Sequence, residues 1–245
     1  MKAFYSKEMK IGVSMCDAAG RLGLANTFAI FQDAASEHAE LLGVGYEEMT
    51  ARKSFWMTTR SRVHFYKRPK LMQAVQVNTW PNAPASLRCD RSYRICAGDE
   101  ILCEGRTEWC VYDLEKGGVK PVSEAGFPED IEYMEELALS APYARLKHNF
   151  TGDDLACSRI VPATDIDMGR HMNNVAYLRA LVNSFSVEEL EKMNISEMEI
   201  FYCMPCFEGD KLDILRRKTD YGYEFGVRRP DGRYAALAQM RAEAE

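Results

Sequence analysis

One polar stretch carries the side chains best suited to chemistry: Asp165-Ile166-Asp167-Met168-Gly169-Arg170-His171-Met172-Asn173-Asn174. Asp167 supplies a carboxylate, and His171 supplies an imidazole that can take up a proton near neutral pH. Four apolar residues follow at steps of three and four: Val175, Leu178, Val182 and Phe185. This spacing predicts a helix with one buried face, and Asn173 or Asn174 is its natural N-cap. The polar cluster therefore stands at a helix start, where free N–H groups and the helix dipole can stabilise an anion.

Composition sets the class of protein around this stretch. The chain has 245 residues, of which 47% are apolar, enough for one large domain or two domains of about 100 to 120 residues each. It lacks the run of about 18 apolar residues that a membrane-spanning helix needs, and Met1 to Ile11 is charged where a signal peptide would be apolar. Eight scattered cysteines indicate buried thiols rather than a disulfide framework. We expect a cytoplasmic protein that is not exported and contacts no membrane.

The charge is unevenly distributed along the chain. Between Arg52 and Arg94 there are ten Lys or Arg residues and a single acid, Asp90, although the whole chain has a net charge of -6. Clustered positive charge favours association with an anionic partner. The alternative is that these side chains are the solvated faces of strands. The chain shows no pattern that favours a nucleic-acid partner, and a homodimer is left open.

The elements that must position the polar stretch occur twice. Helical spacing from Leu24 to Leu42 predicts a long buried helix, with His38 on its inner side as a structural residue. Alternating residues then predict four strands: Trp56 to Tyr66, Met72 to Trp80, Leu87 to Cys96 and Ile101 to Tyr112. After the helix from Asn174, four more are expected: Met198 to Cys203, Lys211 to Lys218, Tyr223 to Arg229 and Arg233 to Ala242. Phe65-Tyr66-Lys67-Arg68-Pro69 matches Phe201-Tyr202-Cys203-Met204-Pro205 between helix and next strand. We therefore predict a duplicated α+β unit, at residues 1–125 and 151–245, joined by a connector at 126–150.

A long helix wrapped by an antiparallel sheet, present twice, resembles the hot-dog fold, and the whole chain resembles the acyl-acyl carrier protein thioesterases. The likeness lies in Gly20 to Leu24, Asn78 to Trp80, Glu108 to Asp113 and above all Asp165 to Tyr177, which is similar to the family's Asp-x-Asp-x-Asn-x-His-x-Asn-Asn signature. It implies two tandem hot-dog units, hydrolysis of fatty acyl thioesters of acyl carrier protein, and an acyl pocket mostly in the first unit. Acyl carrier proteins are acidic, so the region from Arg52 to Arg94 would meet the carrier.

The same resemblance assigns roles to single residues. Asp167, His171 and Asn173 fall in the catalytic segment, while Cys206 matches a Cys of plant-type members. The family's catalytic Asn falls on Gly169, where a water could replace part of the amide's function. A position that holds Glu in many members falls on Pro205.

Thioester hydrolysis needs a nucleophile or activated water and a group that polarises the carbonyl. Asp167 could attack directly or orient water, His171 could act as general base, and amides near Asn173 and Asn174 could receive the oxyanion. Cys206 would at most assist. The alternative is that Asp167 and His171 only cap and brace the helix start.

Other classes of site are less well supported by the sequence. Cys203-Met204-Pro205-Cys206 has CxxC spacing, but no helix is expected after it and no second Cys or His pair could complete a zinc site. GxGxxG, GxxxxGKS/T and GxSxG patterns are absent. We expect no cofactor and no metal. Two other functions remain open: hydrolysis of acyl-CoA, and a non-catalytic module that binds acyl chains or their carrier.

Overall fold

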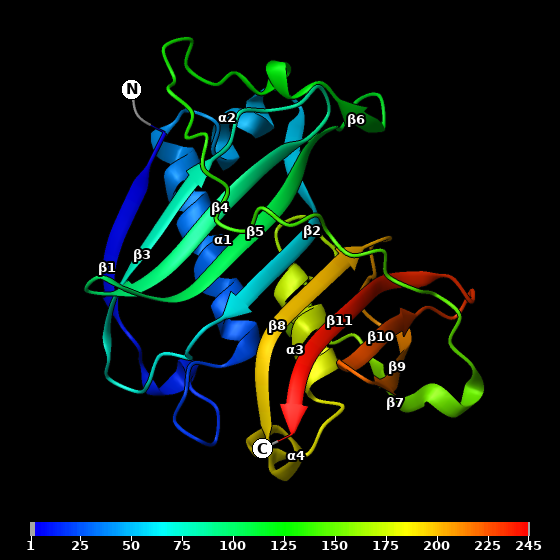
Figure 1. Ribbon diagram of the computed structural model, residues 1–245. Helices are drawn as coiled ribbons and strands as arrows, with labels where there is room; N and C mark the ends of the chain where they lie inside the picture. Colours follow the sequence, from blue (N-terminus) through cyan, green and yellow to red (C-terminus); the bar gives the residue numbers. More distant parts are fainter. Residues whose placement is uncertain (1–2, 245) are drawn as a thin grey trace.

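A computed structural model describes residues 3–244. Within this range one antiparallel sheet of 11 strands runs through the whole molecule, in the order β1-β3-β4-β5-β2-β8-β11-β10-β9-β7, with β6 paired to β5. Figure 1 shows the two long helices, α1 and α3, on the same face of this sheet. The predicted fold, two hot-dog units in tandem, is confirmed.

The first half supplies the longer helix. Its elements are β1 (Tyr5–Lys10), η1 (Val13–Met15), α1 (Leu24–Leu41), α2 (Tyr46–Ala51), β2 (Ser54–Phe65), β3 (Ala74–Pro81), β4 (Cys89–Ala97), β5 (Glu100–Asp113), β6 (Gly118–Lys120) and η2 (Val122–Ala125). The apolar face of α1 packs on the sheet, with Phe31 stacked on Tyr93 of β4 at a centroid distance of 4.7 Å. Gly105 of β5 is required here, because a Cβ at this position would lie 2.4 Å from the ring of Phe31.

The second half repeats this order with shorter helices. Its elements are η3 (Gly152–Asp154), β7 (Leu155–Ile160), η4 (Ala163–Asp165), α3 (Asn174–Val182), α4 (Val187–Glu191), β8 (Met193–Tyr202), β9 (Lys211–Thr219), β10 (Gly222–Arg228) and β11 (Tyr234–Ala244). Asn173 is the N-cap of α3, and its side-chain oxygen accepts a hydrogen bond from Val175 N at 2.8 Å. None of the helices in the described part of the chain is long and apolar enough to cross a membrane.

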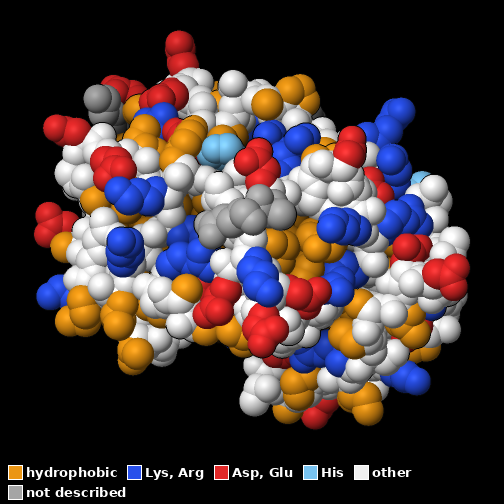
Figure 2. Space-filling view, turned by 60° about the horizontal axis from the view of Figure 1, so that its bottom comes forward, with side chains coloured by type: hydrophobic (Ala, Val, Ile, Leu, Met, Phe, Trp, Pro, Cys, Tyr) orange, Lys and Arg blue, Asp and Glu red, His pale blue; other side chains and the backbone are white. Residues whose placement is uncertain are grey.

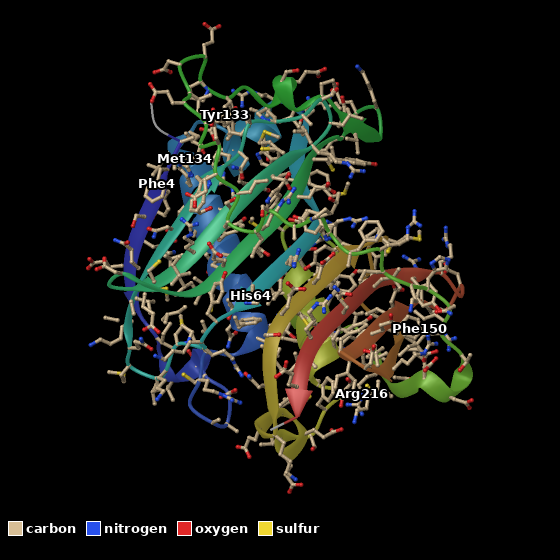
Figure 3. All side chains as sticks on the ribbon, in the orientation of Figure 1. Phe4, His64, Tyr133, Met134, Phe150 and Arg216 are labelled. Atoms are coloured by element: carbon tan, nitrogen blue, oxygen red, sulfur yellow. The ribbon has the colours of Figure 1, made fainter. Side chains whose placement is uncertain are left out.

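The two halves join edge to edge through β2 and β8. Arg62 pairs with Glu199 and Val63 with Met198 in an antiparallel register. On this joint the Arg62 guanidinium reaches the buried Glu197 carboxylate at 2.5 Å, and His64 lies beside it (Figure 3). One apolar core extends through both halves, because α1 and α3 also contact each other. The halves therefore share a sheet and a core.

The connector after η2 lies across the sheet face opposite the helices (Figure 1). Its first part passes the amino-terminal strand, where Ala3 N donates to Glu132 O and Tyr133 and Met134 lie near Phe4 (Figure 3). Further along, Ala144 N donates to the buried Glu199 carboxylate at 2.8 Å. The connector thus packs over the joint between the two halves and is held there by hydrogen bonds.

The sequence patterns missed β1 and β7. Both are the outermost strands of the sheet, and their residues are half-buried or exposed, with none fully buried. An edge strand buries little apolar surface, so it leaves a weak periodic signal. The boundaries expected at 125 and 150 stay a prediction.

Candidate active site

The polar stretch forms a tight loop between η4 and α3. Ile166 and Met172 close the loop by a β-bridge, Asp167 N donates to His171 O, and Arg170 adopts a left-handed conformation with φ 63°. Because the loop folds back on itself, the side chains of Asp167 and His171 lie on the same side of it. The sequence therefore places these two groups together, as expected.

Asp167 and His171 form the candidate reactive pair of the loop, called the reactive pair below. Asp167 Oδ1 lies 3.6 Å from His171 Nδ1 and accepts a hydrogen bond of 2.9 Å from Gly169 N. Both side chains are about one third exposed, at 29% and 32%, so substrate can reach them. The distance exceeds a hydrogen bond, as is common for catalytic pairs before substrate binds. Among the described residues no Lys or Arg pairs with Asp167.

The first half contains a counterpart of this loop that sequence reasoning missed. Asp17 N donates to Arg21 O, and Ala19 N donates to Asp17 Oδ1 at 3.0 Å, which repeats the bonds of Asp167 and Gly169. In this loop Arg21 stands where the second loop has His171. Asp17 is neutralised by Arg68 at 2.8 Å and by Arg21 at 3.4 Å. The first loop therefore lacks an imidazole, and two cations hold its carboxylate.

A cavity of about 620 Å³ opens beside the second loop. Its loop wall consists of Asp167, Met168, Gly169, His171, Asn173 and Asn174. Its other walls come mostly from the first half: α1, α2, β2, the end of β3 at Pro81 and the inner faces of β4 and β5, with Phe127 of the connector. The volume is in the range of ligand-binding pockets. The reactive pair of one half therefore faces a cavity built mostly by the other.

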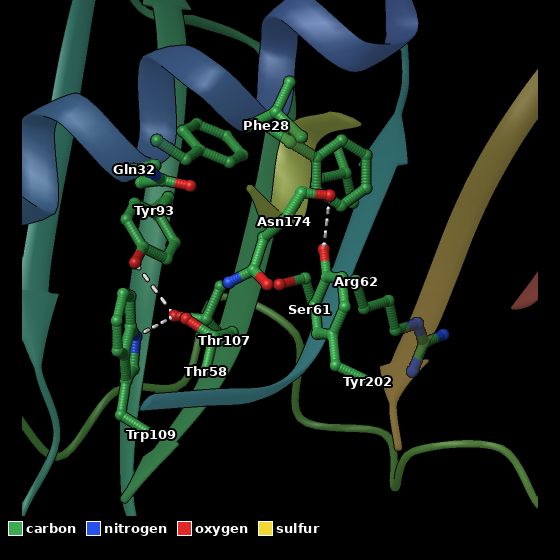
Figure 4. A pocket seen from close by; sticks show the side chains of 13 residues that line it. Phe28, Gln32, Thr58, Ser61, Arg62, Tyr93, Thr107, Trp109, Asn174 and Tyr202 are labelled. Atoms are coloured by element: carbon green, nitrogen blue, oxygen red, sulfur yellow. Dashed lines mark hydrogen bonds between the residues drawn. The ribbon is translucent and has the colours of Figure 1, made fainter. Parts of the chain in front are cut away.

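A small cavity of about 20 Å³ continues from the start of α3 into the core. Figure 4 shows Asn174 between Gln32 of α1 and Thr58 of β2, with Tyr93 and Trp109 to one side of them. Tyr202 OH donates to Asn174 O at 3.3 Å, which fixes the first turn of α3. Gln32 and Asn174 line both cavities. Gln32 was not foreseen, because one polar residue on a helix gives no signal.

Comparison with known proteins identifies the family to which the chain belongs. Residues 2–126 match the acyl-ACP thioesterase N-terminal domain, and residues 155–239 match the acyl-ACP thioesterase C-terminal domain. The chain belongs to the acyl-ACP thioesterase family. A chloroplastic palmitoyl-acyl carrier protein thioesterase of Gossypium hirsutum is 25% identical over 208 residues, covering 80% of this chain and 50% of that protein. The chain spans about half the length of the curated relatives it matches.

Two solved structures of acyl-ACP thioesterases have the same fold. One, from Bacteroides thetaiotaomicron, superposes with a TM-score of 0.89 at 18% identity and covers 98% of each chain. A 12:0-ACP thioesterase from Umbellularia californica gives a TM-score of 0.85 at 16% identity, covering 99% of this chain and 98% of that one. At such identities the likeness establishes the architecture, and the site must be argued from its own residues.

Gly169 stands where the acyl-ACP thioesterase signature has Asn. The geometry of the loop explains this departure. Its φ is not in the left-handed region, and its counterpart Ala19 carries a Cβ in the same turn, so the backbone does not require glycine. Instead, a Cβ at 169 would lie 2.8 Å from His171 Nε2 and 3.1 Å from Asp167 Oδ1. The imidazole thus occupies much of the space that we expected a water to fill. Gly169 lets His171 lie close over the loop.

We expect Gly169→Ala to fold normally but to lower turnover about tenfold or more, because the new Cβ displaces the imidazole from Asp167. The cost in stability should stay within about 0.5 kcal/mol, since the ring can rotate towards solvent. Gly12→Ala is the matched control, because a Cβ there meets nothing within 4 Å. Parallel kinetics and urea unfolding of both variants test this. A Gly169→Ala enzyme that matches Gly12→Ala in turnover would show that the ring position is unimportant.

Cys206 lies beneath the loop rather than on the cavity wall. It is fully buried in the core, its backbone oxygen accepts from Met172 N at 2.8 Å, and its N–H donates to Tyr177 OH at 3.1 Å. Burial raises the pKa of the Cys206 thiol and raises that of Cys203 to about 11, so both favour the neutral form. Both cysteines are free, and a turn and β9 follow them rather than a helix. Among the predicted site residues, the structure brings Asp167, His171 and Asn173 together and leaves Cys206 apart.

In residues 3–244 no group of three or more His, Cys, Asp or Glu side chains is placed to hold an ion. The residues near the reactive pair therefore offer acid–base and hydrogen-bonding chemistry.

Proposed function

We propose that this chain hydrolyses fatty acyl thioesters of acyl carrier protein and releases the free fatty acid, as a step of fatty acid biosynthesis. The observation that carries the proposal is the Asp167–His171 pair on the wall of the 620 Å³ cavity. The family match and the relatives' names support it. A related reading, hydrolysis of acyl-CoA, uses the same loop and cavity and differs only in the carrier.

The loop supplies what the reaction needs. We propose that Asp167 and His171 act on a water, taking its proton while its oxygen attacks the thioester carbon. The tetrahedral intermediate then collapses, the C–S bond breaks, and the proton passes to the leaving thiolate. Thiolates are good leaving groups, so the site needs only one proton-handling pair. Direct attack by the Asp167 carboxylate is the alternative that the same geometry allows.

The start of α3 would receive the oxyanion. Asn173 caps the helix through Val175 N and lines the cavity together with Asn174. Val175 N and Ala176 N already donate to Asn173. Asn173 N donates to a backbone carbonyl of η4, so Asn174 N is the amide of this turn that has no hydrogen-bond partner within the described residues. This amide and the dipole of α3 favour negative charge at this place. We propose that Asn173 positions this amide, and that Cys206 acts only through its backbone bond to the loop.

The basic region from Arg52 to Arg94 is dispersed in the folded protein. Five of its ten cationic residues form ion pairs: Arg62 with Glu197, Lys67 with Glu100, Arg68 with Asp17, Arg88 with Glu108 and Arg94 with Glu104. On the face shown in Figure 2, positive and negative side chains are interspersed. The region is therefore not one continuous patch.

Two exposed cations remain beside the cavity. Lys53 precedes Ser54 and Arg170 follows Gly169, and both of these neighbours line the cavity. Neither Lys53 nor Arg170 forms an ion pair within the described residues. We propose that they receive the acidic surface of acyl carrier protein while its acyl chain enters.

We expect catalytic efficiency on acyl-carrier substrate to fall as salt rises, because exposed charge pairs are screened over about 10 Å at 0.1 M. Lys53→Glu should raise the KM for this substrate about fivefold, whereas the KM for an acyl-pantetheine should not change. Lys70→Glu is the matched control, an equal charge change at an exposed residue outside the cavity lining. Equal salt dependence for both substrates, or equal effects of the two variants, would contradict docking at this rim.

A substrate screen separates the three functions. Purified chain is assayed against a ladder of acyl-carrier and acyl-CoA thioesters. Faster hydrolysis of the carrier series supports the proposal, and faster hydrolysis of the CoA series supports the alternative. Binding of acyl chains without turnover of either series would identify a binding module. We further propose a cytoplasmic location, where the eight free cysteines would stay reduced.

A further inference from the structure

One charged side chain in the large cavity has no part in the chemistry above. Arg91 lies on the inner face of β4, between Cys89 and Tyr93, and is only 6% exposed. It is the sole Lys or Arg residue classed as buried in the described chain, and it lines the 620 Å³ cavity. A buried charge normally has an opposite charge beside it, because burial without one costs several kcal/mol.

One nitrogen of Arg91 is held by the protein. Nη1 lies 3.1 Å from His38 Nδ1 and 3.4 Å from Thr79 Oγ1. Arginine can only donate, so His38 Nδ1 accepts and the imidazole is neutral. Burial, with the charge of Arg91 second, lowers the pKa of His38 to about 3, and Tyr5 stacks on its other face at 5.7 Å. His38 therefore fixes the guanidinium without neutralising it.

The other edge of Arg91 is open. Within residues 3–244, Nε and Nη2 of Arg91 have no hydrogen-bond partner, and no carboxylate forms an ion pair with it. Two carboxylates line the cavity, but Glu40 accepts from Tyr46 N and Asp167 faces His171. The cavity contains no counter-ion for Arg91 of its own.

The same edge of other arginines binds carboxylates in this protein. Arg106 holds Asp90 through Nε at 3.0 Å and Nη2 at 2.7 Å, and Arg217 holds Asp154 through Nε at 3.1 Å and Nη2 at 2.6 Å. Two parallel N–H groups fit the two oxygens of a carboxylate. The open edge of Arg91 presents the same fork to the cavity.

Arg91 and the reactive pair belong to different parts of the cavity wall. The partner of Arg91, His38, follows Gln32 by six residues on α1, which is about 9 Å along the helix axis, and Gln32 lies beside Asn174. On β4, Cys89 packs with Met49 in an apolar cluster separate from the main core, and both residues line the cavity. A group bound by Arg91 therefore belongs to the distal part of an acyl chain.

We propose that the cavity selects acyl chains whose distal end carries a carboxylate, and that Arg91 is the residue that binds it through Nε and Nη2. The substrate would then be a thioester of a dicarboxylic acid, with one carboxyl group at the Asp167–His171 pair and the other at Arg91. This inference rests on the proposed hydrolase function for its kinetic test, and a binding test makes it independent of turnover.

The kinetic test compares pantetheine thioesters of matched chain length that end in a methyl, a hydroxyl or a carboxylate, over a ladder of lengths. The unmodified protein should hydrolyse the carboxylate series with a kcat/KM about tenfold or more above the methyl series. A higher kcat/KM for the methyl series or for the hydroxyl series would overturn the assignment.

Variants of Arg91 test whether this residue causes the preference for acyl chains that end in a carboxylate. Arg91→Met keeps the length and removes the charge, so it should fold and should reverse the preference towards methyl ends. Arg91→Lys keeps a charge without the fork and should retain only part of the preference. Arg233→Met removes an exposed charge from the last hairpin and should leave the preference unchanged. An equal loss on all three series in Arg91→Met would show a structural role only.

The binding test uses amides, which the protein cannot readily hydrolyse. Titration calorimetry compares a fatty acid amide with the amide of matched length that ends in a carboxylate. The second should bind about tenfold or more tightly to the unmodified protein, and Arg91→Met should remove the difference. If thioesters are not hydrolysed but this difference holds, the proposed function fails and the carboxylate site stands. Equal affinity of the two amides would overturn the site.

Discussion

Asp167→Asn and His171→Ala should each lower turnover by roughly two orders of magnitude or more, the usual scale for removing an acid, a base or a nucleophile. Asn keeps the shape of Asp167 and can still accept from Gly169 N, so the loop should hold its conformation. Combining both changes should cost little more than either alone, because the two groups act as a unit. Steady-state kinetics on one acyl thioester, with urea unfolding to confirm folding, measures both effects.

The first half provides a matched control for this prediction. Asp17→Asn makes the same chemical change in the counterpart loop, where Arg68 and Arg21 already neutralise the carboxylate. Its turnover should stay within about threefold of the unmodified protein, although loss of the partly buried ion pair with Arg68 should lower stability. If Asp17→Asn abolished activity while Asp167→Asn did not, the loops would have been assigned in reverse.

Neither half should be stable alone. Residues 1–125 and 151–245, expressed apart, should aggregate or remain poorly folded and should regain structure and activity when mixed. Separation exposes the edges of β2 and β8 and cuts the core shared by α1 and α3. It also leaves Glu197 and Glu199, which are 4% and 1% exposed in the intact protein, without Arg62. Circular dichroism and turnover of the separate and mixed fragments test this.

A point variant at the joint between β2 and β8 measures how much this joint contributes to the free energy of unfolding of the full chain. Arg62→Met removes the cation that two buried carboxylates share, although Glu197 keeps Arg241 at 3.4 Å, so it should lower the free energy of unfolding by about 3 kcal/mol. Arg228→Met is the matched control, because Arg228 pairs with a half-exposed Asp213 and should cost about 1 kcal/mol or less. In the fragment experiment above, two soluble fragments that each unfold cooperatively would contradict the shared sheet and core.

The long periodic elements could be predicted from the sequence because their packing imposes regular spacing. The helix from Leu24 buries one face against strands whose own alternation is regular, so both are visible as patterns. The edge strands β1 and β7, and the short α2, bury too little surface to leave a pattern. The order β5-β2-β8 depends on pairing between residues far apart in the chain, which no local pattern reveals.

The reactive pair could be predicted because its residues are close in sequence. The lining of the cavity could not, because its walls come from α1, α2 and four strands of the first half, and only the family resemblance implied an acyl pocket in that unit. Arg91 looked like one more cation of a basic region, and only its burial beside His38 distinguishes it. The explanation for Gly169 likewise needs the position of the His171 ring, which no spacing rule supplies.

Release of free thiol from acyl carrier protein loaded with a series of acyl chains, by the purified full chain, tests the central claim most directly. The account predicts steady release by the unmodified protein, a rate about a hundredfold lower for Asp167→Asn, and a nearly unchanged rate for Asp17→Asn. No release from any acyl-carrier thioester, or equal release by the unmodified protein and Asp167→Asn, would contradict it.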